Sequence, residues 1–62
     1  MLLCDLCKVP IDRYFVDGVV RGQGWATMCQ SCHEKHGVGL GIGRGQLYQW
    51  QEKTKEFKKI EG

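Results

Sequence analysis

Two Cys-x-x-Cys pairs constrain this chain more than any other feature of its sequence. The pairs are Cys4/Cys7 and Cys29/Cys32. Two residues between paired cysteines let both sulfur atoms turn toward one ion, and structural zinc sites take four such ligands in a tetrahedron. Residues 8–28, between the pairs, slightly exceed the usual spacing, but a β-hairpin brings its two ends together at any length. We therefore predict one structural Zn²⁺ bound by the four thiolates.

The short chain gives a reason for such a site. We treat its 62 residues as one domain, with a zinc-finger core over 1–45 and a C-terminal part over 46–62. In this size range an apolar core is marginal, and a metal, disulfides or a partner is usually needed. Zinc binding by zinc-finger peptides releases about 10–16 kcal/mol, which acts as folding free energy. We expect the metal-free chain to be largely unfolded.

Disulfides and other cysteine chemistry are the alternatives to zinc. Disulfides belong to oxidising compartments, usually reached through a signal peptide, whereas the N-terminal residues 1–5 have neither a basic region nor a long apolar stretch. We expect a cytoplasmic protein, and no segment approaches the roughly 18 apolar residues of a membrane span. Residues 29–33 also match the haem-attachment motif Cys-x-x-Cys-His, but that reading requires export and leaves the first pair unexplained. A thioredoxin-like redox site lacks its βαβ context.

The segments between and after the cysteine pairs predict a small α+β fold. Asp17-Gly18 between two β-prone runs predicts a hairpin with a two-residue turn. Trp25, on the way back to the second pair, is expected in the core over the metal site. Residues 29–36 favour a short helix that ends at Gly37, a natural C′ residue. The sequence thus predicts a zinc knuckle, a β-hairpin and a short helix, in that order.

A run of alternating glycines follows the helix, from Gly37 to Gly45. If extended, it would expose bare backbone on one face and side chains on the other. Close backbone packing is the plainer interpretation, and a phosphate or flat partner surface against Gly41, Gly43 and Arg44 is the alternative. A dinucleotide site is rejected, because the run follows a helix instead of a strand.

The C-terminal residues 46–62 fit two structures. Their apolar residues recur at intervals of three and four, as in an amphipathic helix. The aromatic residues on either side of a polar stretch, Glu52 to Lys55, favour a second hairpin instead. We predict the hairpin and keep the helix as the alternative.

The order of elements resembles that of treble-clef zinc fingers, with the zinc ribbon as a related type. The stretch from Cys29 to Tyr48 also resembles small, mostly uncharacterised zinc-binding proteins of bacteriophages and prophages, and the resemblance extends over most of the chain, from Cys4 to about Gly62. The resemblance supports the four cysteines as ligands and marks residues 37–46 as the distinctive segment. It implies no established activity, and it places the protein in the cytosol of a host cell.

Three functions follow from these features as hypotheses. The first is a non-catalytic binding module with a protein partner, because the chain is small, its metal site is filled by protein ligands and its net charge is only +2. Residues expected to contact a partner or a phosphate are Arg44, Gly41, Gly43, Arg21 and Trp50. The oligomeric state is left open.

The second function is nucleic-acid binding, which would use scattered cations: Arg13, Arg21, Arg44, Lys53, Lys55, Lys58 and Lys59. The small net charge makes this weaker, since nucleic-acid-binding domains carry a stronger basic excess. The third is a His-metal nuclease, in which His33, Glu34 and His36 would supply a second metal and a base. His36 could instead replace one cysteine at the first metal, although we expect both histidines to be exposed or to lie behind the ligands.

Overall fold

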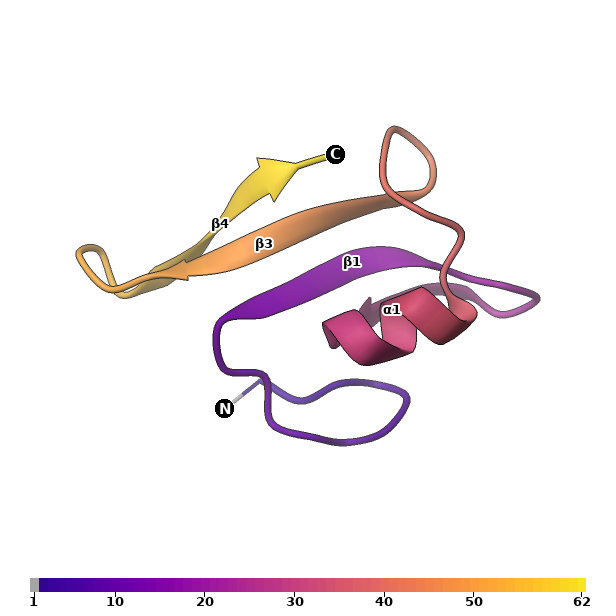
Figure 1. Cartoon of the computed structure of the whole chain (residues 1–62), viewed down its shortest axis with the longest axis horizontal. Helices are drawn as coiled ribbons and strands as arrows, with labels where there is room; N and C mark the ends of the chain where they lie inside the picture. Colours follow the sequence, from indigo (N-terminus) through magenta and orange to yellow (C-terminus); the bar gives the residue numbers. More distant parts are fainter. Residues whose placement is uncertain (1) are drawn as a thin grey trace.

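The computed structural model describes residues 2–62 and shows a four-stranded antiparallel sheet with one short helix (Figure 1). In chain order the elements are β1 (Tyr14–Val20), β2 (Gly24–Met28), α1 (Gln30–His36), β3 (Gly45–Gln51) and β4 (Glu56–Glu61). The strand order in the sheet is β2-β1-β3-β4. The predicted α+β class is confirmed.

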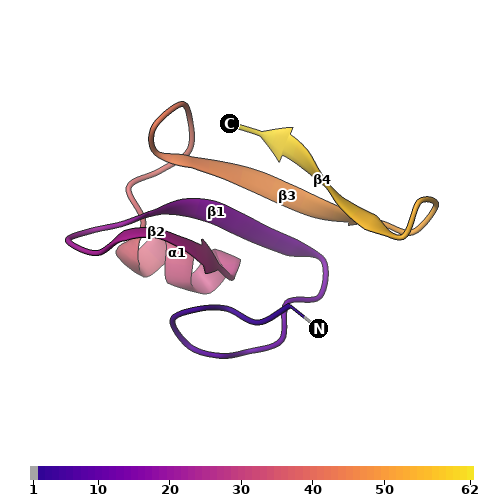
Figure 2. The same ribbon diagram turned by 180° about the vertical axis from the view of Figure 1, so that it is seen from behind.

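The helix covers only one face of the sheet, over its β1–β2 half (Figure 1). Seen from behind, the sheet has neither a helix nor a strand in front of it (Figure 2). Side chains of a strand alternate between the two faces, so buried Val16 and Val20 lie on the helix side and Phe15 and Val19 on the other. The domain is accordingly thin, measuring 36 × 25 × 15 Å.

The N-terminal segment forms a loop at the free edge of β2. The backbone N–H of Asp5 donates to the Thr27 carbonyl at 2.8 Å, and the Thr27 N–H donates back to the Asp5 carboxylate at 2.9 Å. Within the loop, Cys4 N–H donates to the Val9 carbonyl at 3.0 Å. These bonds fix the first cysteine pair beside the end of β2, which runs directly into the second pair.

The buried core is very small. Among residues 2–62 its fully buried apolar members are Cys4, Val16, Val20, Met28 and Cys32. Two of these five are cysteines, which supply little apolar area in comparison with a leucine or a phenylalanine. Apolar burial therefore gives this fold little stability, as the chain length predicted.

The first hairpin forms, but the predicted turn at Asp17-Gly18 is wrong. Both residues lie inside β1, where Gly18 pairs with Ala26 on one side and with Gly45 on the other. The turn falls instead at residues 21–23, where Gly22 has a φ of 75°. A Cβ on Gly18 would lie 3.1 Å from the Arg44 carbonyl oxygen. This glycine thus serves a close approach of two backbones.

Two further expectations around the helix need correction. Trp25 is 54% exposed and does not cover the metal site, because its position in β2 points it to the face opposite the helix. The helix ends at His36 as predicted, yet Gly37 has a φ of −81° and is not left-handed. A Cβ on Gly37 would clash with the ring of His33, so packing explains the glycine there.

The glycine run is a folded loop and not an extended strand. Gly39, Gly41 and Gly43 all have positive φ, and Gly41 pairs with Gly45 across a tight turn. The alternating pattern therefore reflects repeated left-handed backbone, which glycine adopts without steric cost. Ile42, at the tip, is 96% exposed.

The C-terminal segment is the predicted hairpin, and the helical alternative is wrong. β3 and β4 pair from Leu47↔Glu61 to Gln51↔Glu56, with an irregularity between Leu47 and Tyr48. β3 also pairs with β1, so the hairpin belongs to the same sheet as β1 and β2. Together these pairings place β4 at the sheet edge.

Candidate metal centre

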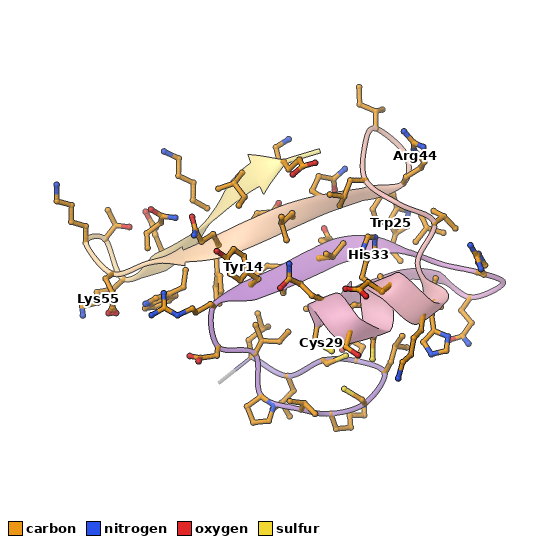
Figure 3. The ribbon with its side chains drawn as sticks, in the orientation of Figure 1. Tyr14, Trp25, Cys29, His33, Arg44 and Lys55 are labelled. Atoms are coloured by element: carbon orange, nitrogen blue, oxygen red, sulfur yellow. The ribbon has the colours of Figure 1, made fainter. Side chains whose placement is uncertain are left out.

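The four cysteine side chains meet at one point between the N-terminal loop and the start of α1. The Sγ atoms of Cys4, Cys7, Cys29 and Cys32 all lie within 4.8 Å of one another. Figure 3 shows Cys29 directed from the helix side toward the N-terminal loop, where the other sulfur atoms lie. All four are free thiols.

Local backbone structure positions each pair. In the first pair, Lys8 N–H donates to the Cys4 carbonyl at 2.9 Å, and Lys8 takes a left-handed φ of 65°. This tight turn points both sulfur atoms to one side. In the second pair, Cys29 is the N-cap of α1 and Cys32 lies one turn further on, so the helical repeat brings their side chains to the same face.

The spacing of the sulfur atoms fits a tetrahedral metal. A metal–sulfur distance of about 2.3 Å places the sulfur atoms of a regular tetrahedron about 3.8 Å apart. Cys7 Sγ lies 3.8 Å from Cys29 Sγ. This distance is far beyond a disulfide bond of about 2.05 Å, so the cluster is positioned to bind a metal ion.

The surroundings of the cluster shift two of its thiols in opposite directions. Burial tends to raise the pKa of the Cys4 thiol, but hydrogen bonds outweigh it and lower the pKa from 9.0 to about 6. The main donors are the backbone N–H groups of Cys7, Cys29 and Leu6. For Cys32, burial and then hydrogen bonds with the other thiols raise the pKa to about 12. The fold therefore favours the thiolate form of Cys4 and the thiol form of Cys32.

The two histidines lie outside the cluster. His33 Nε2 lies 3.1 Å from the Gly39 carbonyl oxygen, which links α1 to the glycine loop. Among the described residues, the metal-ligating group contains only the four cysteines. His33 thus contacts the backbone of the glycine loop and not a ligand, whereas His36 is exposed, as expected.

The residues predicted to contact a partner do not form one surface. Arg44 lies beside Gly41, whose Cβ would come within 2.9 Å of the Arg44 guanidinium, and the Arg44 carbonyl accepts from Val19 N–H at 2.8 Å. Arg21 follows β1 at this same end of the sheet. Trp50 lies at the opposite end, where its backbone N–H donates to the Arg13 carbonyl.

Sequence reasoning missed an aromatic cluster on the open face of the sheet. Phe15 stacks on Tyr48 with ring centroids 4.7 Å apart, and Phe57 packs edge-on against Phe15 and Trp50. These rings come from β1, β3 and β4. The alternation Tyr48-Gln49-Trp50 was the available signal, but it gave no indication of the long-range pairing with β1.

Comparison with known proteins gives no assignment: no protein-family model, curated protein or solved structure matches the chain. The resemblance to phage proteins therefore stays a prediction. Within residues 2–62, α1 is neither long enough nor apolar enough to cross a membrane.

Proposed function

We propose that the four-cysteine cluster binds one Zn²⁺ and that the chain is a non-catalytic binding module held together by this ion. The support is the sulfur geometry, in which one measured separation equals the edge of a zinc–thiolate tetrahedron. Four protein ligands fill the coordination shell, which is typical of structural sites and leaves no position for a substrate. Tetrahedral thiolate sites also suit iron, so the metal has to be identified directly.

The surface proposed for binding is the open sheet face. Its apolar members, defined by strand alternation and register, are Phe15, Val19, Trp25, Tyr48, Trp50 and Phe57. We call this set the aromatic face. Trp25 is 54% exposed, and Trp and Tyr side chains commonly carry the binding energy of protein interfaces. The metal lies on the other side of the sheet, so its role there is to fix the fold.

A protein partner is favoured by the charges of this face. The register places only Asp17 and Lys59 on it as charged residues, which leaves it close to neutral. Lys58 lies on the opposite face of β4, and the remaining cations lie in α1, in the loops and at the two ends of the sheet. A nucleic-acid surface needs clustered cations to neutralise phosphates, and this face offers one lysine.

Single-stranded nucleic acid is a second candidate, because one observation favours it. Exposed aromatic rings on an antiparallel sheet can stack on bases without reading the sequence. This alternative predicts an affinity that falls steeply with added salt. Protein binding through the nearly neutral aromatic face should instead change little between 50 and about 200 mM salt.

The proposal is tested with the zinc-loaded chain immobilised and exposed to lysate of the producing cells. Native mass spectrometry of the purified protein first gives the metal mass, and a colourless solution distinguishes zinc from iron bound to thiolates. We expect a captured protein that is lost with Trp25→Ser and retained with Lys35→Ser, an exposed helix control. Capture of nucleic acid alone, or of nothing, would contradict the proposed function.

The finer predictions stand as proposals beside this one. We propose a treble-clef arrangement because a knuckle, a hairpin and a helix follow one another in the required order. A phage or prophage origin is proposed from the resemblance over most of the chain, and a cytoplasmic location is proposed because thiols stay reduced in that compartment. The genomic neighbourhood of the coding sequence tests the origin directly.

A further inference from the structure

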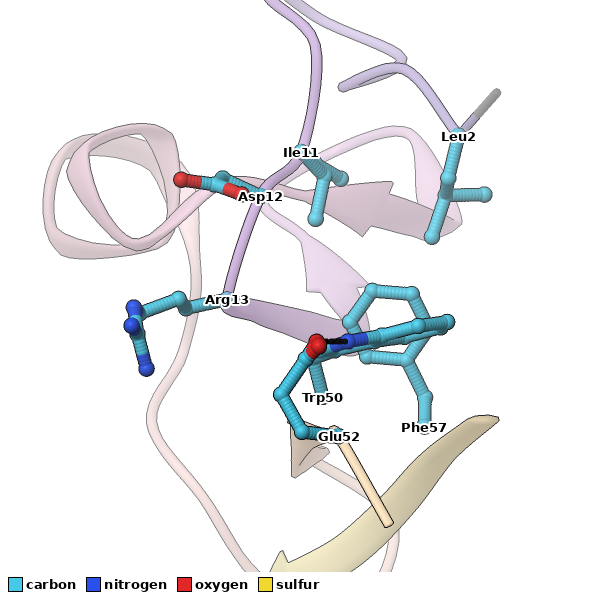
Figure 4. Close-up of a pocket in the computed structure, with 7 residues that line it drawn as sticks. All are labelled: Leu2, Ile11, Asp12, Arg13, Trp50, Glu52 and Phe57. Carbon is cyan, nitrogen blue, oxygen red and sulfur yellow. Dashed lines mark hydrogen bonds between the residues drawn. The ribbon is translucent and has the colours of Figure 1, made fainter. Parts of the chain in front are cut away.

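A hollow of about 380 Å³ lies where the N-terminal segment meets the C-terminal hairpin. Its walls are apolar: Leu2 and Ile11 come from the segment, and Trp50 and Phe57 come from β3 and β4 (Figure 4). The volume falls within the range of about 300–1,000 Å³ that is typical of ligand pockets. It does not include any cysteine of the metal centre.

The indole of Trp50 is fixed as one wall of this hollow. Its Nε1–H donates to the Glu52 carboxylate at 3.0 Å, and Phe57 packs against it edge-on with ring centroids 5.2 Å apart. In Figure 4 the indole is seen edge-on, and Leu2 and Ile11 lie together on one side of its plane. One ring face is therefore presented to the hollow in a defined orientation.

This indole is well suited to attract a cation. The face of an aromatic ring carries negative electrostatic potential, and Trp attracts cations more strongly than Tyr or Phe. Donation from Nε1 to the negatively charged Glu52 carboxylate adds electron density to the ring. A cation over the Trp50 face would benefit from both effects.

The charged residues at the rim point to the same class of ligand. Two carboxylates, of Asp12 and Glu52, line the hollow against one guanidinium, of Arg13. Glu52 also forms an exposed ion pair with Lys55 at 3.6 Å, a surface contact of little strength that an incoming cation replaces. In Figure 4 the side chains of Asp12 and Arg13 both extend away from the two rings, so Glu52 is the carboxylate next to Trp50. The carboxylates disfavour a phosphate or another anion, while the apolar walls suit a chain of methylene groups.

We propose that this hollow binds a lysine or arginine side chain carried by a protein partner. The methylene groups of that side chain pack against Leu2 and Ile11, and its cationic end lies over Trp50 beside the Glu52 carboxylate. The inference rests on the proposed function, since it specifies the partner as a protein with an exposed basic segment. It adds a defined anchor point to the end of the aromatic face.

The test is a titration of the ¹⁵N-labelled, zinc-loaded chain followed by NMR. The probes are three blocked pentapeptides that differ only at the central residue, which is lysine, norleucine or glutamate. We expect the lysine peptide to shift the indole N–H signal of Trp50 and to leave that of Trp25 unchanged. The norleucine peptide should bind more weakly and the glutamate peptide should have no effect.

Two double variants make the test specific to the rim charges. Asp12→Asn with Glu52→Gln should weaken the lysine peptide roughly three- to tenfold, the loss expected of partly exposed charges beside an aromatic ring. Glu34→Gln with Glu61→Gln changes the net charge equally but at exposed positions away from the hollow, and it should leave the affinity unchanged.

Three results would overturn the proposal: equal binding of the norleucine and lysine peptides, binding of the glutamate peptide at Trp50, or an unchanged affinity in the Asp12/Glu52 double variant. The lysate experiment separates this failure from failure of the proposed function. If the wild-type chain and that double variant capture the same protein equally, the module binds a protein but not through this hollow.

Discussion

Replacing Gly45 and Gly43 by alanine should destabilise the protein for two different physical reasons. Gly45 is buried in β3, and a Cβ there would lie 2.9 Å from the Gly39 carbonyl oxygen and 3.3 Å from Val16 Cγ1. Gly43 has open space around it, with nothing within 4 Å of a Cβ, but its φ is +77°. One glycine is required by space and the other by backbone conformation.

The two costs follow from these geometries. At Gly45 the overlap forces the glycine loop away from the sheet, which costs about 1–3 kcal/mol as for other overpacked sites. Restriction of the unfolded chain by alanine offsets about 0.4–1 kcal/mol of this, leaving a net loss of about 1–2 kcal/mol. At Gly43 the left-handed backbone costs alanine about 1–2 kcal/mol, and the same offset leaves about 1 kcal/mol.

Asparagine distinguishes the two causes because it tolerates left-handed backbone but is larger than alanine. Gly43→Asn should therefore be more stable than Gly43→Ala, whereas Gly45→Asn should be less stable than Gly45→Ala. The assay is urea unfolding followed by circular dichroism. Free zinc is buffered at one concentration for all variants, because bound metal adds to the free energy of unfolding according to its free concentration. The same order of stability at both positions would refute this reasoning.

Removal of the metal by a chelator should unfold the chain, because residues 2–62 contribute only five buried apolar side chains to the core. NMR signals should lose their dispersion and regain it when zinc is returned, and persistent dispersion in the metal-free chain would contradict this. Metal affinity should decrease as the pH is lowered, because protons compete with the metal at Cys32, whose pKa is raised. The decrease should become steeper below about pH 6, where protons also compete at Cys4, whose pKa is lowered to about 6. Cobalt affinity measured at each pH by competition with a chelator checks this, and a fall that is as steep between pH 6 and 9 as below pH 6 would show that Cys4 has an ordinary pKa. Lys8→Gly should raise the free energy of unfolding by up to about 1 kcal/mol, because glycine adopts the left-handed φ of 65° without the steric cost of a Cβ. The control Lys35→Gly, within α1, should lower the free energy of unfolding by about 1 kcal/mol.

The metal cluster was predictable because its information is local. Each Cys-x-x-Cys spacing brings two sulfur atoms to one side of a short turn or a helix, and only the meeting of the two pairs depends on the fold. The second hairpin was predictable for a similar reason, since its strands and its turn are consecutive in sequence. In both cases a short segment contains most of the interactions that decide its structure.

Other features depend on contacts between distant segments. Asp17-Gly18 has the composition of a type I′ turn, but pairing of β1 with β2 and β3 extends the strand through it. Trp25 was assigned to the core because it is large and apolar, whereas the face on which it lies is set by its register opposite Val19. The hollow joins residues 2–13 to residues 50–57, and no local pattern connects these segments.

Zinc and the hollow should be coupled even though the metal lies outside the hollow. Leu2 and Ile11, which form one wall, flank the knuckle on either side, and Ile11 N–H donates to the Leu2 carbonyl at 2.8 Å. Because the Cys4/Cys7 thiolates anchor this loop to α1, loss of the metal should release the wall as well. Zinc should therefore raise the affinity for the lysine peptide, and by thermodynamic linkage the peptide should raise the affinity for zinc by the same factor. Competition with a zinc chelator, with and without saturating peptide, measures that factor, and a factor of one would show that the hollow forms independently of the metal.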